Sequence, residues 1–257
     1  MKILYFNVTV GCKEAARYKG LVNFIRKQKP DVLGLSELNG WNRDNFAKLN
    51  KFKAQTGLRY SLFCESPHGY HIALLSRTPL QREYVSRKGI WHGVIIAAVR
   101  VRGKHYSFAL THLSPISEEF RLNDLKQIFA KLKANKHAIL MGDMNSISPQ
   151  DHIDEKTLLL RARKLQIKKF GTEGIEKAVI SSILRRGMLD VSHIKEPKSR
   201  VYSVPTGYIH DPRHFAHLHL DYIFVTKDLK SKVKRAGVLK NRETDALSDH
   251  YPVFAQL

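Results

Sequence analysis

Residues 138–145, AILMGDMN, join a short uninterrupted apolar run to an acidic residue and an amide. An apolar run of this length is typical of a buried β-strand. The residues that follow such a strand lie at the edge of the sheet, where a rigid scaffold displays functional side chains. Asp143 and Asn145 are therefore the first candidate functional residues.

The same pattern, an apolar run bounded by a polar residue, recurs along the chain. Six further residues occupy such positions: Asn7, Glu37, His112, Asp221, Asp249 and His250. The first three follow their runs and the last three precede theirs. If the earlier strands are aligned and the last two run opposite, all these side chains meet at one edge of the sheets. Taken singly, each residue has an ordinary structural alternative. Asn7 could be a turn residue, Asp249 could cap a helix, and a lone histidine usually lies on the surface.

Eight apolar runs are predicted to form strands, and two stretches with helical periodicity are predicted to form helices. The strands are Ile3–Phe6, Val32–Leu35, Ile72–Leu75, Val94–Val101, Tyr106–Leu110, Ala138–Met141, Tyr222–Val225 and Tyr251–Ala255, and the helices are Glu14–Gln28 and Ser117–Lys133. The basic segment Arg161–Gly187 is interpreted as surface helix and loop. This mixture favours mixed sheets with outer helices, in a single domain spanning residues 1–257.

The composition is that of a packed protein with a strong positive charge. The chain has 257 residues, with 44 Lys and Arg against 23 Asp and Glu, a net charge of +21. A field of this sign attracts polyanions, nucleic acid foremost. Two cysteines exclude a disulfide scaffold, no apolar run reaches the roughly 20 residues that span a bilayer, and the first residues lack the features of a signal peptide. We expect a cytoplasmic protein without stable membrane association, and the sequence does not say which protein partners it has.

The chemistry of the predicted cluster points to a divalent cation. Its members include four carboxylates, and like charges crowded in one cleft raise one another's pKa unless a cation compensates them. A site rich in oxygen donors favours Mg²⁺ or Mn²⁺ over Zn²⁺. The two imidazoles suit charge stabilisation on a phosphate and proton transfer.

The motifs together resemble the endonuclease/exonuclease/phosphatase superfamily, in the branch that includes pancreatic deoxyribonuclease and tyrosyl-DNA phosphodiesterase. They cover residues 3–254: FNV at Asn7, LSEL at Glu37, GYHIALLSRTPL at 69–80, THL at His112, GDMN at 142–145, HLDYIFV at Asp221 and SDHYPV at 248–253. The fold that this resemblance implies is a four-layer α/β sandwich, with two packed mixed β-sheets flanked by helices.

The resemblance also implies a role for each residue. The metal would be held by Glu37 with Asn7 and Asp249 near it, and the catalytic residues would be His112, Asp143, Asn145, Asp221 and His250. In this scheme Asp143 orients or deprotonates water, Asn145 holds the phosphate or the nucleophile, and Asp221 fixes the tautomer of His250. Either Asp143 or His250 could be the base. The reaction implied is metal-assisted phosphoester hydrolysis by in-line attack of water.

Three departures from the family pattern disfavour the abasic-site endonuclease branch and favour the branch with a histidine at position 112. Thr9 stands where abasic-site endonucleases carry an aspartate, Thr-His-Leu replaces their Tyr-x-Pro-Asn, and Ser36 replaces the usual glutamine before the metal-binding glutamate. We therefore expect a nuclease acting on DNA or RNA. The alternatives are a phosphomonoesterase or phospholipase of the same superfamily, with an inositol phosphate or sphingomyelin-type substrate, and a non-catalytic nucleic-acid-binding protein.

Further basic and aromatic residues are candidates for substrate contact. In an extended strand His217 and His219 would share a face with Asp221, as phosphate contacts or as an additional transition-metal site, whereas His210 and His214 are interpreted as a surface loop. Arg77 follows the GYHIALLSR element and could track a nucleic-acid backbone. Trp41, Trp91 and Tyr208 could stack on bases, although packing is the commoner use of such residues.

Overall fold

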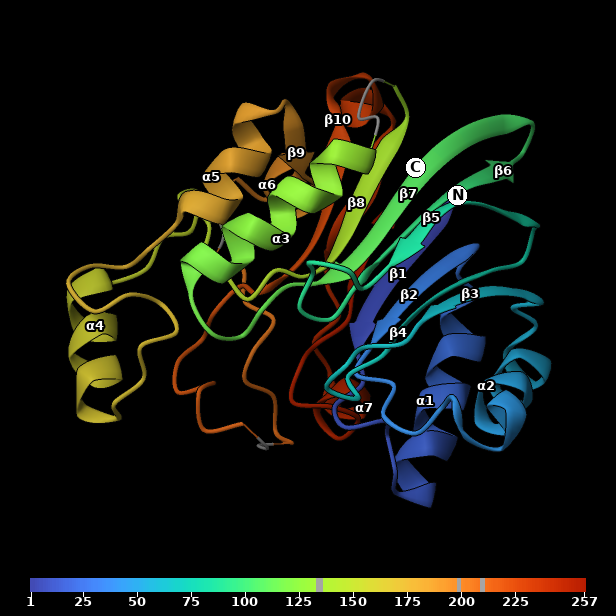
Figure 1. The fold of residues 1–257 in the computed structure, drawn as a ribbon, viewed down its shortest axis with the longest axis horizontal. Helices are drawn as coiled ribbons and strands as arrows, with labels where there is room; N and C mark the ends of the chain where they lie inside the picture. Colours follow the sequence, from blue (N-terminus) through green and yellow to red (C-terminus); the bar gives the residue numbers. More distant parts are fainter. Residues whose placement is uncertain (133–135, 198–199, 209–210) are drawn as a thin grey trace.

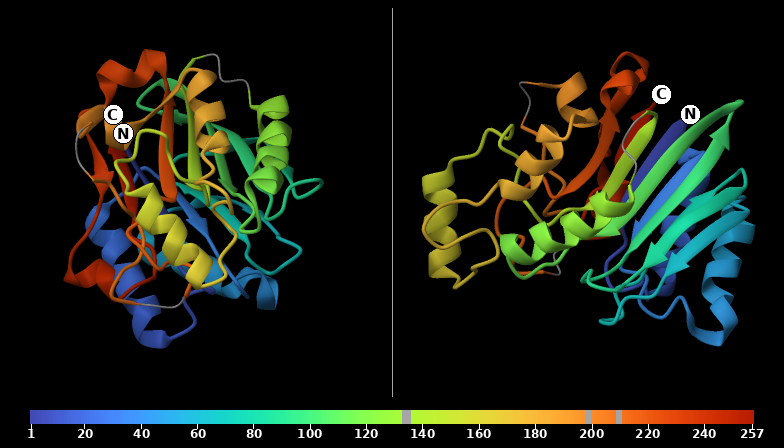
Figure 2. Two further views of the ribbon diagram at one scale, coloured as in Figure 1. Left: turned by 90° about the vertical axis from the view of Figure 1, so that its left-hand side faces the viewer. Right: turned by 45° about the horizontal axis from the view of Figure 1, so that its top comes forward.

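Two six-stranded β-sheets lie face to face, and helices cover their outer faces (Figure 1). The structure, a computed structural model, describes residues 1–132, 136–197, 200–208 and 211–257. The two sheets and the helices outside them form four layers, which the side views of Figure 2 also show. The four-layer α/β sandwich with two mixed sheets is therefore confirmed.

The first sheet has the strand order β11-β12-β1-β2-β4-β3. Its strands are β1 (Lys2–Asn7), β2 (Val32–Ser36), β3 (Tyr60–Cys64), β4 (Ile72–Ser76), β11 (Arg235–Val238) and β12 (Val253–Gln256). β1 and β2 are parallel, and β12 runs antiparallel to β1. The helices α1 (Ala15–Gln28) and α2 (Arg43–Thr56) pack on its outer face, and α7 (Arg242–Asp245) precedes β12.

The second sheet has the strand order β5-β6-β7-β8-β10-β9. Its strands are β5 (Leu80–Ser86), β6 (Val94–Val101), β7 (Lys104–His112), β8 (Ala138–Asp143), β9 (Met188–Asp190) and β10 (Asp221–Thr226). The helices α3 (Glu118–Lys131) and α5 (Ala178–Arg185) cover its outer face. The remaining helices are α4 (Glu155–Lys164), α6 (Val191–Lys195) and the 3₁₀ turn η1 (Lys227–Lys232). No helix in the described part of the chain is long and apolar enough to cross a membrane.

The central strands are apolar on both faces because both faces are buried. In β1, Tyr5 points into the core between the two sheets, whereas Leu4 and Phe6 point to the helices on the outside. In β8, Met141 faces the same central core and Leu140 faces α3 and α5. Side chains alternate along a strand, so a continuous apolar run is what a strand buried between two layers requires.

The strand directions bring the polar strand ends together, as the sequence pattern predicted. β1 ends beside β2, with Asn7 opposite Ser36 and Glu37 next along the chain. In the other sheet, the parallel β7 and the antiparallel β10 both place their polar ends at Asp143, which pairs with His112 on one side and with Asp221 on the other. The two sets lie at the same edge of the sandwich because the sheets pack face to face.

The eight predicted strands are present, β6 with the predicted ends and the other seven with shifted ends, and four further strands were not predicted. β3, β5 and β11 carry exposed or half-exposed side chains, and β9 has three residues, so their apolar pattern is weak. α2 was also missed, since polar residues dominate its sequence. The segment 161–187 holds the end of α4 and all of α5. The predicted helix 117–133 ends at Lys131, and residue 133 lies outside the described residues.

Gly142 allows β8 to approach β7 closely just before Asp143. A Cβ atom at this position would lie 1.9 Å from the Thr111 carbonyl oxygen, and the backbone φ is +155°. We expect Gly142→Ala to lower the free energy of unfolding by about 2 kcal/mol or more, because backbone rather than a side chain must move. Urea unfolding followed by circular dichroism measures this. Gly174→Ala, where a Cβ meets nothing within 4 Å, is the matched control, and equal losses in both variants would contradict the expectation.

Candidate active site

A cavity of about 410 Å³ opens at the edge where the polar strand ends meet. Six of the eight residues that the sequence analysis brought together line it, namely Glu37, His112, Asp143, Asn145, Asp249 and His250. The other two, Asn7 and Asp221, are fully buried and contact the lining residues. The predicted convergence of distant strand ends is therefore present in the structure.

The amide of Asn7 connects the ends of the two sheets. Its Nδ2 donates to Glu37 Oε1 at 3.0 Å and to Asp143 Oδ2 at 3.3 Å. The same nitrogen lies 3.4 Å from Nε2 of His250. Its Oδ1 accepts a hydrogen bond from the backbone N–H of Thr9. Asn7 thus presents a donor to the site, and its role beside the metal stays a prediction.

His250 is held between two carboxylates. Its Nδ1 donates to Asp221 Oδ2 at 2.7 Å, and its Nε2 faces Asp143 Oδ2 at 3.8 Å. Burial alone would lower the pKa of His250, but the surrounding carboxylates, Asp221 foremost, outweigh it and raise the pKa to about 10. The raised pKa favours the imidazolium form of the ring, which directs Nε2–H at the cavity.

Glu37 and Asp249 supply two further carboxylates close to this imidazolium. Glu37 Oε2 accepts from the Val10 N–H at 3.0 Å, and burial raises the pKa of Glu37. Asp249 Oδ1 accepts from the Thr9 hydroxyl, and its Oδ2 lies 3.4 Å from His214 Nδ1. Burial opposes the charge on Asp249, but the imidazoles beside it outweigh burial and lower the pKa. Two anionic oxygen donors at one side of a polar cavity fit Mg²⁺ or Mn²⁺.

The second predicted imidazole, His112, is uncharged. Its Nε2 lies 3.4 Å from Asp143 Oδ2, and its ring packs on the ring of His92 at 4.4 Å. Burial lowers the pKa of His112 well below its usual value, and the neighbouring His250 adds to this. Asn145 completes the group, with its Nδ2 committed to the Leu113 carbonyl at 2.8 Å. The site thus holds one charged and one neutral imidazole.

The cavity also holds residues that the sequence analysis missed. His214 is buried with its ring 4.8 Å from that of His250, so its interpretation as a surface-loop residue was wrong. Lys169 is buried and lines the cavity, where burial lowers its pKa to about 8. Arg213 also lines the cavity. Both cations lie on irregular loops, where no periodicity marks them.

The three residues predicted to contact substrate lie outside this cavity. Arg77 donates to the carbonyls of Pro30, Thr56 and Gly57 and so caps the end of α2. His217 is exposed and stacks on Tyr202, and His219 is buried beside Asp151. None of these side chains lines the cavity, so His217 and His219 do not share the face of Asp221 that was expected, and the contact of Arg77 with a nucleic-acid backbone stays a prediction. His210 lies outside the described residues.

The three aromatic candidates are used differently. Trp41 is fully buried and donates to the Gly11 carbonyl, and Tyr208 packs under the guanidinium of Arg17. Trp91 is half-buried and lines the cavity. Of the three, Trp91 is placed to contact a substrate.

Several residues around the cavity adopt left-handed backbone conformations that side chains other than glycine disfavour. They are Thr9, Val10, Glu37 and Asn145, with φ between 49° and 59°. Each costs of order 1–3 kcal/mol, and such strain clusters at functional sites because the surroundings must hold it in place. Here it directs Glu37 and Asn145 toward the same cavity.

Comparison with known proteins identifies the family. The family model described as the Endonuclease/Exonuclease/phosphatase family matches residues 4–250. A comparison with curated protein sequences found no match.

Solved structures with the same fold include three similar ones. An AP endonuclease from Archaeoglobus fulgidus is 20% identical with a TM-score of 0.70, covering 99% of this chain and 98% of its own. A 3′-5′ exonuclease from Neisseria meningitidis is 22% identical with a TM-score of 0.69, and the match covers 100% of this chain and 99% of the exonuclease. A 3′ phosphatase from Neisseria bound to a product DNA hairpin is 22% identical with a TM-score of 0.71, also covering 100% and 99%. At these identities the likeness shows the shared fold.

The charge on His250 depends on the carboxylate beneath it. In metal-free protein we expect Asp221→Asn to move the His250 pKa from about 10 toward its ordinary value of 6.5. The Asp221 carboxylate is the main group that counteracts the lowering of this pKa by burial. Imidazole ¹⁵N chemical shifts titrated against pH measure this. Asp228→Asn is the matched control, since it removes the carboxylate that pairs with His137 at 3.3 Å. An unchanged His250 pKa in Asp221→Asn would show that Asp221 does not set the charge.

Proposed function

The chain belongs to the endonuclease/exonuclease/phosphatase family, whose members hydrolyse phosphoester bonds, and from this premise we propose that it is a divalent-metal-dependent nuclease that hydrolyses DNA or RNA. The observation that carries the proposal is the convergence, on one cavity, of the Glu37 and Asp249 carboxylates and the Asp221–His250 pair. This arrangement offers carboxylate oxygens for a cation close to a cationic proton donor.

Glu37 and Asp249 would hold the cation, Mg²⁺ or Mn²⁺. Bound there, the cation supplies Lewis-acid polarisation of a phosphoryl oxygen and stabilises charge on the leaving oxygen. The carboxylates need such a partner, since burial raises the pKa of Glu37 and a cation would keep it ionised.

The chain's own residues supply the rest of the chemistry. The His250 imidazolium, fixed by Asp221, offers Nε2–H to a non-bridging phosphate oxygen. Asp143 accepts hydrogen bonds from Asn7 and from the Asn145 backbone N–H, and its carboxylate is placed to orient water and to take its proton. Lys169 adds a second positive charge at the cavity wall.

Charge and aromatic surface favour a polynucleotide over a small phosphoester. The net charge of +21 supplies long-range attraction for a polyanion. At the cavity mouth the Trp91 ring stacks on His68 at 4.6 Å and meets the edge of Phe120, which is 47% exposed. Such rings suit base stacking. A DNA-bound 3′ phosphatase with this fold is consistent with the proposal and favours phosphomonoester removal from a nucleic-acid end as the second candidate.

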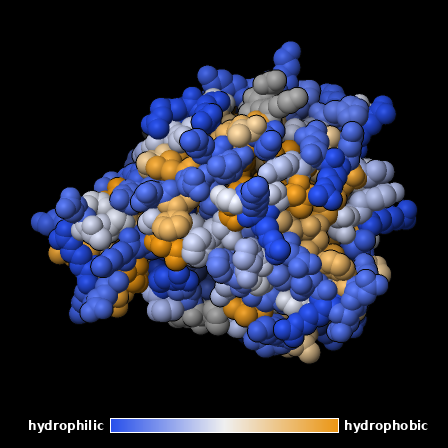
Figure 3. All heavy atoms as spheres, in the orientation of Figure 1, coloured by the Kyte–Doolittle hydropathy of each residue, from blue (hydrophilic) through white to orange (hydrophobic). Residues whose placement is uncertain are grey.

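A phospholipase activity has less support. In the face drawn in Figure 3, hydrophilic residues predominate and apolar ones are interspersed among them. Docking on a lipid surface would favour a contiguous apolar patch beside the cavity.

The proposal is tested by a substrate panel with and without divalent metal. The panel comprises duplex, nicked, abasic and single-stranded DNA, RNA, 5′-tyrosyl DNA and 3′-phosphorylated DNA, with inositol phosphate and sphingomyelin vesicles as the alternatives. We expect hydrolysis of nucleic acid that EDTA abolishes. Glu37→Gln and His250→Gln should each lower kcat by about a hundredfold or more, because each removes a charge that stabilises the transition state.

The matched controls are Glu83→Gln and His105→Gln, which change the same residue types at exposed positions and should retain activity. Tight binding of every polynucleotide without turnover under Mg²⁺ or Mn²⁺ would instead identify a non-catalytic binding protein. Phosphate release from inositol phosphate alone would favour the small-substrate alternative.

Base stacking gives a separate expectation. Trp91→Ala should raise KM for the preferred polynucleotide by roughly fivefold to a hundredfold, the equivalent of about 1–3 kcal/mol for one stacked base. The KM for bis-para-nitrophenyl phosphate, which has no base, should change little. Steady-state kinetics on both substrates measure this split, and equal effects on the two would indicate that Trp91 only shapes the cavity.

A further inference from the structure

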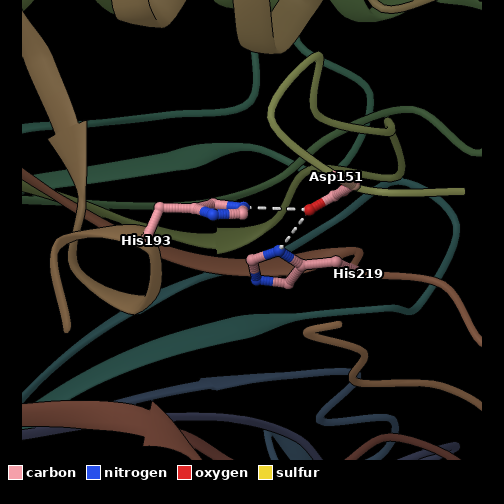
Figure 4. Close-up of side chains that lie close together, drawn as sticks. All are labelled: Asp151, His193 and His219. Atoms are coloured by element: carbon pink, nitrogen blue, oxygen red, sulfur yellow. Dashed lines mark hydrogen bonds and ion pairs between the residues drawn. The ribbon is translucent and has the colours of Figure 1, made fainter. Parts of the chain in front are cut away.

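A second buried cluster of acids and imidazoles lies apart from the cavity. It comprises Asp151 on the loop after β8, Asp190 at the end of β9, His193 in α6 and His219 just before β10. None of the four lines the candidate active site. Figure 4 shows that the rings of His193 and His219 both point at one carboxylate oxygen of Asp151.

The side chains in this cluster are close and nearly free of solvent. Asp151 Oδ1 lies 3.0 Å from His193 Nε2 and 3.4 Å from His219 Nδ1. These three atoms lie within 4.8 Å of one another. Their side chains are at most 5% exposed, which is rare for groups of this polarity.

Asp190 adds an independent observation. Its side chain is fully buried, and its Oδ2 lies 3.9 Å from His193 Nε2 and 3.9 Å from His219 Nδ1. This oxygen has no hydrogen-bond partner among the described residues. A buried carboxylate oxygen left unpaired is costly, and here it is aimed at the same two ring nitrogens as Asp151.

We propose that Asp151, Asp190, His193 and His219 form a structural site for a transition-metal cation, Zn²⁺ foremost. The donor atoms would be Asp151 Oδ1, Asp190 Oδ2, His193 Nε2 and His219 Nδ1, the mixture of imidazole and carboxylate that suits zinc. With metal–ligand distances of about 2.0–2.1 Å, a tetrahedral site has ligand–ligand separations of about 3.3–3.4 Å. Asp151 Oδ1 lies 3.0 and 3.4 Å from the two imidazole nitrogens, and Asp190 Oδ2 lies 3.9 Å from each of them. Asp151, His193 and His219 offer atoms that all lie within 4.8 Å of one another, and the Asp190 carboxylate would move inward to complete the site.

Charge balance supports the assignment. Two ionised carboxylates and two neutral imidazoles carry −2, and one divalent cation brings the buried group to zero. In the absence of a cation, the Asp190 carboxylate would need either a proton or an imidazolium at a distance too long for a hydrogen bond. Imidazole ligands also disfavour Mg²⁺, which prefers oxygen, so the two sites of this chain differ in the metal they select.

The site would fasten three segments that converge behind the active site. The loop at Asp151 follows Asn145, which lines the cavity, and His219 lies two residues before Asp221. A cation joining them to β9 and α6 would fix the start of β10 and hence the carboxylate beneath His250. Its role is structural, and the inference does not depend on which substrate the cavity accepts.

Metal retention tests the proposal without an activity measurement. The full chain is stripped with EDTA, reloaded with Zn²⁺ in excess Mg²⁺, and equilibrated with a chromophoric zinc chelator. Wild-type protein should retain one Zn²⁺ per chain and unfold at a higher temperature than the stripped protein. Asp190→Asn and His193→Gln should each weaken zinc binding by more than about tenfold, because each removes a metal ligand. Even residues that only hydrogen-bond to metal ligands change metal affinity by about tenfold or more.

Two controls locate the ion. His214→Gln alters one of the two other groups in the described part of the chain that could bind zinc, His214 with Asp249 and His250, and should keep the affinity unchanged. His137→Gln removes an imidazole from an ordinary ion pair with Asp228 and should also have no effect. Loss of zinc in His214→Gln with retention in Asp190→Asn would overturn the proposal, as would a wild-type chain that retains none.

A crystallographic measurement avoids reliance on variants, which could fail to fold. Wild-type crystals grown with Zn²⁺ and recorded at the zinc absorption edge should show an anomalous peak between Asp151 and Asp190, in contact with both imidazoles. A peak confined to the cavity, or no peak, would refute the site.

Discussion

The hydrogen bond from His250 Nδ1 to Asp221 Oδ2 is the interaction on which the architecture of the site depends. It joins the residue that opens β10 in one sheet to the residue that precedes β12 in the other, so it crosses between the layers of the sandwich. An imidazolium fixed there offsets the carboxylates of Asp143 and Asp249 as well as Asp221. Without a positive charge at this position, the carboxylates would raise one another's pKa and the site would lose its ionised form.

The negative charge of Glu37 and Asp249 is stabilised by hydrogen-bond donors of the first sheet, and this explains the unusual backbone conformation there. Glu37 and Asp249 receive hydrogen bonds from the Val10 N–H and the Thr9 hydroxyl. Thr9, Val10 and Glu37 all have left-handed backbone angles, which the flanking strands β1 and β2 hold in place because both faces of those strands are packed. The strain is thus tolerated at the ends of two buried strands, and it positions donors that a regular strand would direct elsewhere.

The strand ends could be predicted from the sequence because a periodic signal marks them. An apolar run fixes the strand, and the next polar residue then lies at the sheet edge, as Asn7, Glu37 and Asp143 do. Lys169 and His214 carry no such signal, since they reach the cavity on loops whose course depends on tertiary packing. The weak strands were missed for a related reason, because exposed positions interrupt the continuous apolar run by which the buried strands were identified.

The histidines before β10 show how a local rule fails when its premise is absent. A shared face for His217, His219 and Asp221 requires a regular strand, but β10 begins at Asp221 and residue 218 forms an isolated bridge with Val204. Leu218 and Leu220 are packed into a separate apolar cluster. With those two side chains buried, His219 turns toward Asp151 while His217 remains exposed against Tyr202. The segment therefore places an imidazole behind the active site, where Asp151, His193 and Asp190 give it a chemistry separate from that of the cavity.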